Sequence, residues 1–150
     1  MKVLFIYPNA GSQVGFNYGI SHLSAVLKEA GHNVALWQLC DDIETLPSED
    51  QFANRLKQEN ADIIGFSVVT NQWPYARKLA AWARKTTRVP LVCGGIHAMA
   101  AGEEILRSGV FDYIIRGEAE EAFAEFIAKV DSGQDLSSVR NLGYLHNNAV

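Results

Sequence analysis

Cysteine is scarce in this sequence, and long apolar runs are absent. The two cysteines, Cys40 and Cys93, have neither a CxxC spacing nor the number needed for a disulfide framework, which favours buried thiols in a reducing compartment. Each apolar run has the length of a strand, well below the roughly 20 residues of a membrane-spanning helix. Residues 1–4 lead into a strand pattern without a signal-type cleavage site. We therefore expect a cytoplasmic chain with no membrane partner and no metal bound by its own side chains.

Positive charge is also in the minority. The chain has 13 Lys and Arg against 17 Asp and Glu, which gives a net charge of -4. No stripe of basic residues alternates with aromatic residues, as a nucleic-acid groove would require, so we expect no nucleic-acid partner. At 150 residues and 48% hydrophobic composition, the chain has enough apolar side chains to build one compact domain with a substantial core.

Five short apolar segments alternate with amphipathic segments along the chain. Rich in Val, Ile, Leu and Phe, they predict strands at residues 2–7, 33–38, 62–68, 89–93 and 112–115. Strands without polar alternation are buried on both faces, which is typical of a parallel sheet covered by helices on each side. Right-handed crossovers then predict an α/β fold in three layers: a doubly wound, five-stranded parallel sheet with the flavodoxin-like (Rossmann-like) order 2-1-3-4-5.

The pattern changes after Gly133. Residues 135–140 are polar, and residues 141–150 follow the pattern of a strand, an Asn-Asn turn and the start of a returning strand. We expect residues 1–131 to form the domain, and residues 132–150 to be a linker and the start of a hairpin. Because this hairpin is unfinished, we also expect the chain to be part of a longer polypeptide with a further C-terminal domain.

Small and hydroxylated residues follow two of the predicted strands. The strand at 62–68 ends near Ser67, Val69 and Thr70, and the strand at 89–93 is followed by Gly94-Gly95. In open α/β sheets, ligands bind outside the carboxyl ends of the strands, where the strand order reverses. These two strand ends therefore predict a binding crevice.

The fingerprints of three common families with this outline are missing. A dinucleotide-binding domain needs GxGxxG after the first strand, whereas Gly11, Gly15 and Gly19 are spaced by four. A phosphate-accepting receiver domain needs Asp after the third strand, where this chain has Ser67. A flavodoxin needs a hydroxyl-rich loop after the first strand, and residues 8–13 offer Ser12 alone.

Six segments match a different family in order and spacing. They are Tyr7-Pro8-Asn9, residues 19–34, residues 62–67, Gly94-Gly95-Ile96-His97-Ala98, residues 112–118 and Asn141-Leu142. Together they resemble the N-terminal cobalamin (B12)-binding domain of cobalamin-dependent radical SAM enzymes, over nearly the whole chain. In that family's cobalamin domains, a Ser-x-Leu after the third strand and a Gly-Gly after the fourth line a slot for the nucleotide tail. Ser67-Val68-Val69 and Gly94-Gly95 stand at these two places.

The resemblance implies cobalamin as the cofactor and a set of binding residues at the strand ends. The set is Asn9, Gly11, Ser67, Val69, Thr70, Gly94, Gly95, His97, Gly117 and Glu118. A flat benzimidazole needs walls without bulky side chains, which glycines supply, and a serine hydroxyl can donate to a ring nitrogen. We therefore expect Gly95→Val to abolish cobalamin binding while the fold survives. The alternative is structural: Gly94-Gly95 as a plain turn, Ser67 as a cap, and Glu118 at a helix start.

Histidine is missing from residues 9–19, where mutase-type cobalamin domains carry the histidine that ligates cobalt. The resemblance therefore implies bound cobalamin whose cobalt lacks that lower ligand. For His97 two roles stay open, a polar contact to the cofactor and cobalt ligation, and we favour the first.

For the intact protein, the resemblance implies methyl transfer, or a cyclisation or rearrangement, beside a SAM-derived radical. The [4Fe–4S] cluster and S-adenosyl-L-methionine (SAM) would belong to a C-terminal radical SAM domain of the same chain, because two cysteines cannot supply CxxxCxxC. We expect no enzyme activity from this chain alone, and its small-molecule substrate is unknown. Two alternatives stay open: a degenerate domain that does not bind B12 and acts as a structural or substrate-capping unit, and an unrelated flavodoxin-like ligand-binding domain.

Overall fold

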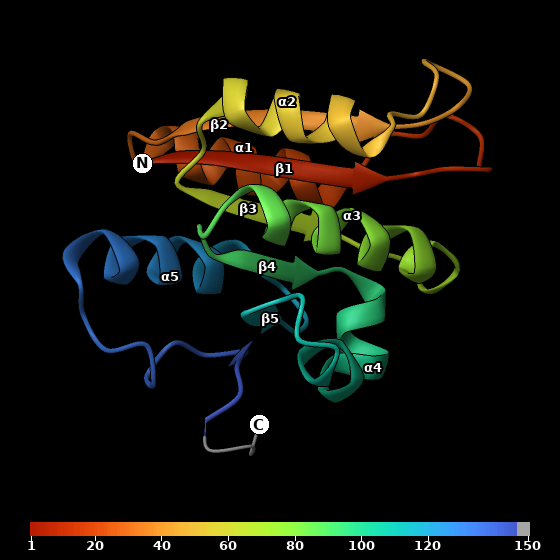
Figure 1. Cartoon of the computed structure of the whole chain (residues 1–150). Helices are drawn as coiled ribbons and strands as arrows, with labels where there is room; N and C mark the ends of the chain where they lie inside the picture. The colour runs from red at the N-terminus through yellow and green to blue at the C-terminus, as the bar shows by residue number, and fades with distance from the viewer. Residues whose placement is uncertain (147–150) are drawn as a thin grey trace.

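Five parallel strands form the middle layer of the molecule in the computed structural model, which describes residues 1–146. They are β1 (Lys2–Pro8), β2 (Asn33–Leu39), β3 (Ile63–Ser67), β4 (Leu91–Gly94) and β5 (Tyr113–Ile115). Their order is β2-β1-β3-β4-β5 (Figure 1), which confirms the predicted α/β fold and strand order. Because β1 pairs with β2 and with β3, the strand order reverses beside β1.

A sixth strand extends the sheet beyond the five that were predicted. β6 (Leu142–Gly143) pairs antiparallel with β5 and places Leu142 opposite Ile115. A strand was predicted at the start of residues 141–150; the predicted Asn147-Asn148 turn and returning strand lie outside the described residues. Val139, in the segment expected to be a linker, is buried in the core. The domain boundary at residue 131 stays a prediction.

Helices cover both faces of the sheet (Figure 1). α1 (Tyr18–Glu29) and α5 (Glu120–Ser132) pack on one face. α2 (Glu49–Glu59), α3 (Trp73–Thr86) and α4 (Ile96–Arg107) pack on the other, and the short 3-10 helix η1 (Thr70–Gln72) leads into α3. α2 begins with a capping box in which the side chains and backbones of Ser48 and Gln51 bond reciprocally, which satisfies amide groups at the helix start.

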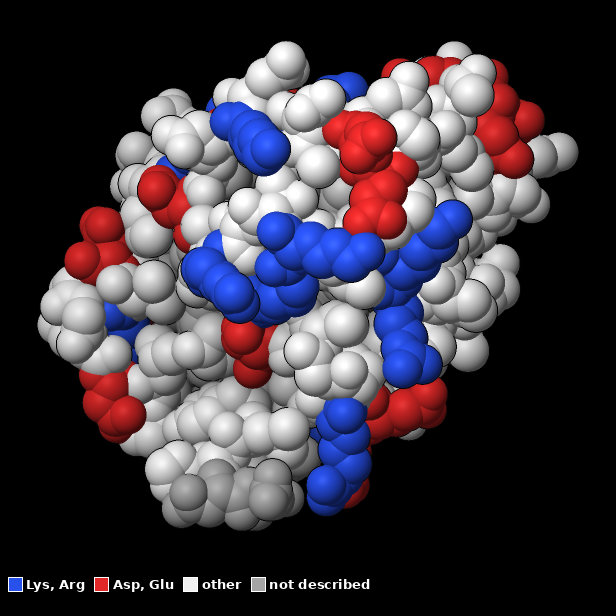
Figure 2. Space-filling model, viewed as in Figure 1, with Lys and Arg blue, Asp and Glu red and all other residues white. Residues whose placement is uncertain are grey.

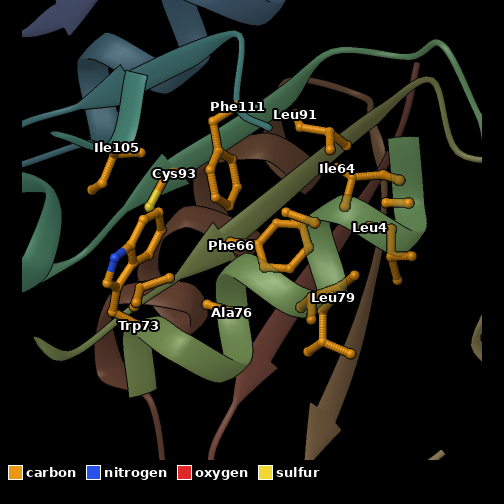
Figure 3. Packing of buried hydrophobic residues seen from close by; sticks show 14 of the residues in the cluster. Leu4, Ile64, Phe66, Trp73, Ala76, Leu79, Leu91, Cys93, Ile105 and Phe111 are labelled. Carbon is orange, nitrogen blue, oxygen red and sulfur yellow. The ribbon is translucent and has the colours of Figure 1, made fainter. Parts of the chain in front are cut away.

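The larger core lies between the sheet and α2, α3 and α4. Phe66 of β3 and Phe111 meet edge to face there, with ring centroids 5.2 Å apart, and Ala76 and Leu79 of α3 pack close by (Figure 3). α3 turns alanines toward the sheet at positions 76, 80 and 83, all fully buried. These small side chains let the helix backbone lie close to the strands.

The second core lies under α1 and α5. Leu27 of α1 packs there with Phe123, Phe126 and Ile127 of α5, all of them buried. At the carboxyl end of β4 the sheet has a glycine, Gly94, on this face in place of a larger side chain. The packing is therefore incomplete at that end, and a pocket remains.

Basic residues gather on the outer face of α3 and its neighbours (Figure 2). α3 contains Arg77, Lys78, Arg84 and Lys85 and no acidic residue. Two of these cations are paired, Arg84 with Asp112 and Lys85 with Glu49. Across residues 1–146, no helix combines the length and apolar character needed to cross a membrane.

Candidate functional site

A pocket of about 140 Å³ opens at the carboxyl edge of the sheet, meaning the edge at which strands β1 to β5 end. It lies between the ends of β3, β4 and β5 and the helices α1 and α5. Its apolar walls are Phe5 of β1, Ile20 and Leu23 of α1, and Phe123 of α5. Sites that enclose a whole small-molecule ligand typically measure a few hundred Å³ or more, so this pocket suits one part of a larger ligand.

Gly94 keeps the strand side of this pocket open. Side chains alternate between the two faces along a strand, so Gly94 shares the pocket face with Val92, while Cys93 faces the core under α3. A Cβ built on Gly94 would lie 3.9 Å from its nearest neighbours, the carbonyl oxygens of Phe66 and Ile115. A side chain at this position would therefore extend into the pocket without striking the backbone.

Gly95 has a different role, because it lets two loops approach closely. Its φ is +90°, and a Cβ there would lie 2.7 Å from the carbonyl oxygen of Val68. The Val68 N–H donates to the Gly94 carbonyl, and the Val68 carbonyl accepts from the His97 N–H, each at 3.0 Å. A side chain at Gly95 would break this contact between the β3 and β4 ends. The geometry contradicts our expectation that Gly95→Val leaves the fold intact.

Ser67 supplies a polar group at the end of β3. Its Oγ accepts a hydrogen bond of 3.0 Å from Nδ2 of Asn17, the residue that caps α1. A hydroxyl that accepts in this way keeps its own proton for another acceptor. Glu118 and Glu120 also line the pocket, and no described lining residue is Lys or Arg. The pocket is thus apolar within, with one hydroxyl and two carboxyl groups.

Half of the predicted binding set meets in this pocket: Ser67, Gly94, Gly95, Gly117 and Glu118 all line it. Gly117 has φ +71° and makes the turn that leads from β5 toward α5. The five residues come from three separate strand ends, as expected for a site at the carboxyl edge of a parallel sheet. Their contacts with a cofactor remain predictions.

Four other residues of the set lie at the same edge but outside the pocket. Asn9 is buried and is tied to its own loop, because its Nδ2 donates to the Gln13 carbonyl at 3.0 Å. The Gly11 N–H donates to Oδ1 of Asp41 at 2.8 Å. Val69 and Thr70 are exposed where β3 passes into η1.

His97, the tenth residue of the set, packs away from the pocket. It is 4% exposed, and its ring centroid lies 4.9 Å from that of Trp73 in the core under α3. Neither ring nitrogen has a hydrogen-bond partner among the described residues. Burial lowers the pKa of His97, which favours a neutral imidazole. These contacts support neither a polar contact to the cofactor nor cobalt ligation, and both roles stay untested.

Sequence reasoning missed the walls that the helices contribute. Ile20, Leu23 and Phe123 were not among the predicted binding residues, and the structure places all three in the pocket wall. Gly65 was a usable signal, because glycine inside a strand indicates close approach of another group. A Cβ at Gly65 would lie 2.9 Å from the Phe5 ring, so that ring occupies the space which Gly65 leaves.

Neither cysteine lines the pocket. Cys40 and Cys93 are buried free thiols, and burial raises the pKa of Cys93 to about 12, so this thiol stays protonated. Within residues 1–146, no cluster of three or more His, Cys, Asp or Glu side chains is placed to hold a metal ion.

Comparison with known proteins identifies the family. The family model for the B12 binding domain matches residues 11–127. The chain is 27% identical over 155 residues to the anaerobic magnesium-protoporphyrin IX monomethyl ester cyclase of Rubrivivax gelatinosus, a match that covers 96% of this chain and 28% of that protein. It is 26% identical over 159 residues to an uncharacterized methyltransferase of Pyrococcus horikoshii, covering 100% of this chain and 34% of that protein. The chain thus spans about a third or less of the length of these relatives.

Solved structures share the fold. The radical S-adenosylmethionine methyltransferase TsrM from Kitasatospora setae, with cobalamin and a [4Fe–4S] cluster bound, matches with a TM-score of 0.86 at 17% identity, over 99% of this chain and 28% of that chain. The cobalamin-dependent S-adenosylmethionine radical enzyme OxsB, with aqua-cobalamin bound, matches with a TM-score of 0.78 at 19% identity, over 97% and 21%. With the family model covering well over half of its residues, this chain belongs to the B12-binding domain family, and it resembles the cobalamin-binding modules of cobalamin-dependent radical SAM enzymes.

Proposed function

We propose that this chain is the cobalamin-binding module of a B12-dependent radical SAM enzyme, and that its pocket takes the nucleotide tail of the cofactor. The observation that carries the proposal is the opening at Gly94, where the strand wall lacks a side chain beside the Ser67 hydroxyl. A flat aromatic base can enter such a slot, and a ring nitrogen on it can accept the hydroxyl proton.

The other pocket walls fit an aromatic base. The rings of Phe5 and Phe123 lie 5.5 Å apart between centroids and give the pocket an aromatic wall. Burial of a planar apolar group against such walls is favourable because it removes apolar surface from water. A phosphate in the pocket would instead find Glu118 and Glu120, and neither Lys nor Arg, among the described lining residues. The pocket therefore favours a neutral base over the phosphate group of a flavodoxin-type ligand.

The corrin ring is too large for this pocket and would lie on the carboxyl edge around it. Exposed apolar side chains are available in the loops and helix starts there: Val14, Phe16, Tyr18, Val69, Ile96 and Met99. Large apolar side chains gathered on a surface typically mark a ligand or partner site. Bound cobalamin would supply a cobalt centre able to carry a methyl group, while this chain binds the cofactor and orients it.

The activity of the intact protein forms the second part of the proposal. A radical SAM domain in the same polypeptide would hold the [4Fe–4S] cluster and SAM, and the reaction would be methyl transfer, cyclisation or rearrangement. In support, the matched relatives are about three times as long as this chain, which leaves room for such a domain.

Reconstitution with hydroxocobalamin tests the binding function. The chain is mixed with an excess of cofactor, desalted and examined for corrin absorption, and we expect retention close to one equivalent. Gly94→Val should weaken cobalamin binding by roughly 5- to 150-fold, because the new side chain fills the pocket; overpacking of a closed site typically costs about 1 to 3 kcal/mol.

Ala128→Val is the matched control, since it places the same branched side chain at an exposed position of α5 outside the pocket. It should bind as the parent does. If the parent retained no corrin, the proposed function would be wrong. If Gly94→Val bound normally with an unchanged circular dichroism spectrum, the pocket would not be the tail site.

A further inference from the structure

The side chain of Asn17 bridges two walls of the pocket. Its Oδ1 accepts the backbone N–H of Ile20 at 3.0 Å and so caps α1, while its Nδ2 donates to Ser67 Oγ at 3.0 Å. α1 contributes Gly19, Ile20 and Leu23 to one wall, and Ser67 ends the strand on another. One amide group thus joins the start of α1 to the end of β3.

The cap determines which end of the Asn17 amide faces Ser67. A backbone N–H needs an acceptor, so the amide oxygen must point toward Ile20. The NH2 group is then left facing Ser67, and it can only donate. This arrangement follows from the chemistry of the cap and does not depend on telling nitrogen from oxygen in the amide.

The Ser67 hydroxyl is restricted as a result. Because its oxygen accepts from Asn17, its proton cannot point along that bond. Among the hydrogen bonds of residues 1–146, none has Ser67 Oγ as the donor. Since Ser67 lines the pocket beside Gly94 and Gly95, a ligand in the pocket can take this proton.

We infer that Asn17 is a positioning residue which makes the Ser67 hydroxyl a hydrogen-bond donor toward the pocket, and that this pair selects a nucleotide base with an unprotonated ring nitrogen. The inference rests on the proposed function and adds a specificity determinant to it. A serine without such a neighbour can donate or accept, whereas this serine is set to donate. A base without an acceptor nitrogen in its ring cannot accept a hydrogen bond from the Ser67 hydroxyl.

The test exploits the difference between Asn and Asp at position 17. Asn17→Asp keeps the helix cap, because Asp and Asn are equally good cap residues. It replaces the NH2 donor with a carboxylate oxygen, which would accept the Ser67 proton and withdraw it from the pocket. Dissociation constants are measured for two corrinoids: cobalamin, whose benzimidazole has a free ring nitrogen when it is released from cobalt, and p-cresolylcobamide, whose phenolic base has none.

We expect Asn17→Asp to weaken cobalamin binding by roughly 3- to 10-fold, the usual value of one net hydrogen bond, and to leave p-cresolylcobamide binding unchanged. Ser67→Ala should give the same pattern. The double variant should lose no more than Ser67→Ala alone, because both changes remove the same donated proton.

Asn17→Ser keeps a capping oxygen without reaching Ser67, so it provides a second variant should Asn17→Asp fold poorly; thermal unfolding monitors both. Equal loss of affinity for the two corrinoids would show that Asn17 acts on the fold alone and would overturn the inference. Unchanged cobalamin affinity in Asn17→Asp would overturn it as well. A parent chain that binds neither corrinoid would contradict the proposed function itself, which is a distinguishable result.

Discussion

At the scale of a single residue, His97 is a buried titratable side chain whose ring nitrogens have no hydrogen-bond partner among the described residues. It is buried against Trp73, and burial lowers its pKa from 6.5, with Glu104 opposing the shift. In the unfolded chain the same imidazole titrates near pH 6.5. Below that pH the unfolded state therefore binds more protons than the folded state, and the free energy of unfolding falls. Above about pH 7.5 both states are neutral at this residue, and its titration has no effect.

Replacing His97 with Phe tests this coupling. His97→Phe keeps an aromatic ring against Trp73 and removes the titratable group. We expect the variant to gain stability relative to the parent as the pH falls from 7.5 to 5.0, measured by urea unfolding followed by circular dichroism. The control is His22→Gln: the His22 side chain is 70% exposed and lies 3.7 Å from Oε1 of Glu120, so its removal should give no gain in stability at low pH. A difference between His97→Phe and parent that did not change with pH would count against the buried neutral histidine.

Two adjacent glycines show how far residue types alone predict a site. The Gly94-Gly95 pair indicated a slot at a strand end, and both residues do line the pocket. Their separate roles depend on facts that a sequence pattern does not contain. Gly94 belongs to β4 and faces the pocket by strand alternation, whereas Gly95 has φ +90° and lies against the Val68 backbone. Only the register of β4 distinguishes the residue that opens the pocket from the one that permits the turn.

At the scale of elements, strand ends were predictable and loop paths were not. Ser67 and Gly94 end their strands, so sheet order alone brings them together. The loop after β1 is instead held by two side-chain amides: Gln72 of η1 donates to the Ala10 carbonyl at 2.7 Å, and Asn9 donates to the Gln13 carbonyl within the loop. Apolar periodicity carries no information on such polar side-chain contacts, whether they are local or join distant parts of the chain.

The place of β6 in the sheet could not be predicted from apolar periodicity either. A strand was expected near residue 142, but its pairing with β5 depends on tertiary packing. Val139 is 5% exposed and lies in the core with Leu136 and Leu142 packed nearby. The segment after α5 therefore contributes buried surface to the fold.

Val139→Ala measures this contribution. Removing two buried methyl groups should lower the free energy of unfolding by roughly 1 to 3 kcal/mol. Leu145→Ala is the control: Leu145 is 38% exposed, and its loss should change stability by less than about 0.5 kcal/mol. Both values come from denaturant unfolding of the whole chain. Equal, small effects of the two substitutions would mean that the segment after α5 adds little to stability.

At the scale of the whole molecule, basic and apolar side chains lie on different parts of the surface. Basic side chains gather on the outer face of α3 (Figure 2), and exposed apolar side chains gather at the carboxyl edge around the pocket. A corrin ring on that edge would keep one face directed outward. We therefore propose that a radical SAM domain of the intact protein approaches the carboxyl edge, because a methyl group on cobalt has to face the reactants.

If this chain binds the cofactor and a radical SAM domain carries out the radical chemistry, the chain by itself should bind cobalamin without cleaving SAM. With two cysteines, it cannot ligate a [4Fe–4S] cluster through CxxxCxxC, and without that cluster no electron reaches SAM. We expect the chain loaded with cobalamin, given SAM and a low-potential reductant, to form no 5′-deoxyadenosine above the protein-free control, as measured by liquid chromatography and mass spectrometry. It should still retain its corrin through the incubation, because the proposed site for the nucleotide tail lies within this chain. Production of 5′-deoxyadenosine by the purified chain would require a source of electrons other than such a cluster and would contradict this separation of binding from radical chemistry.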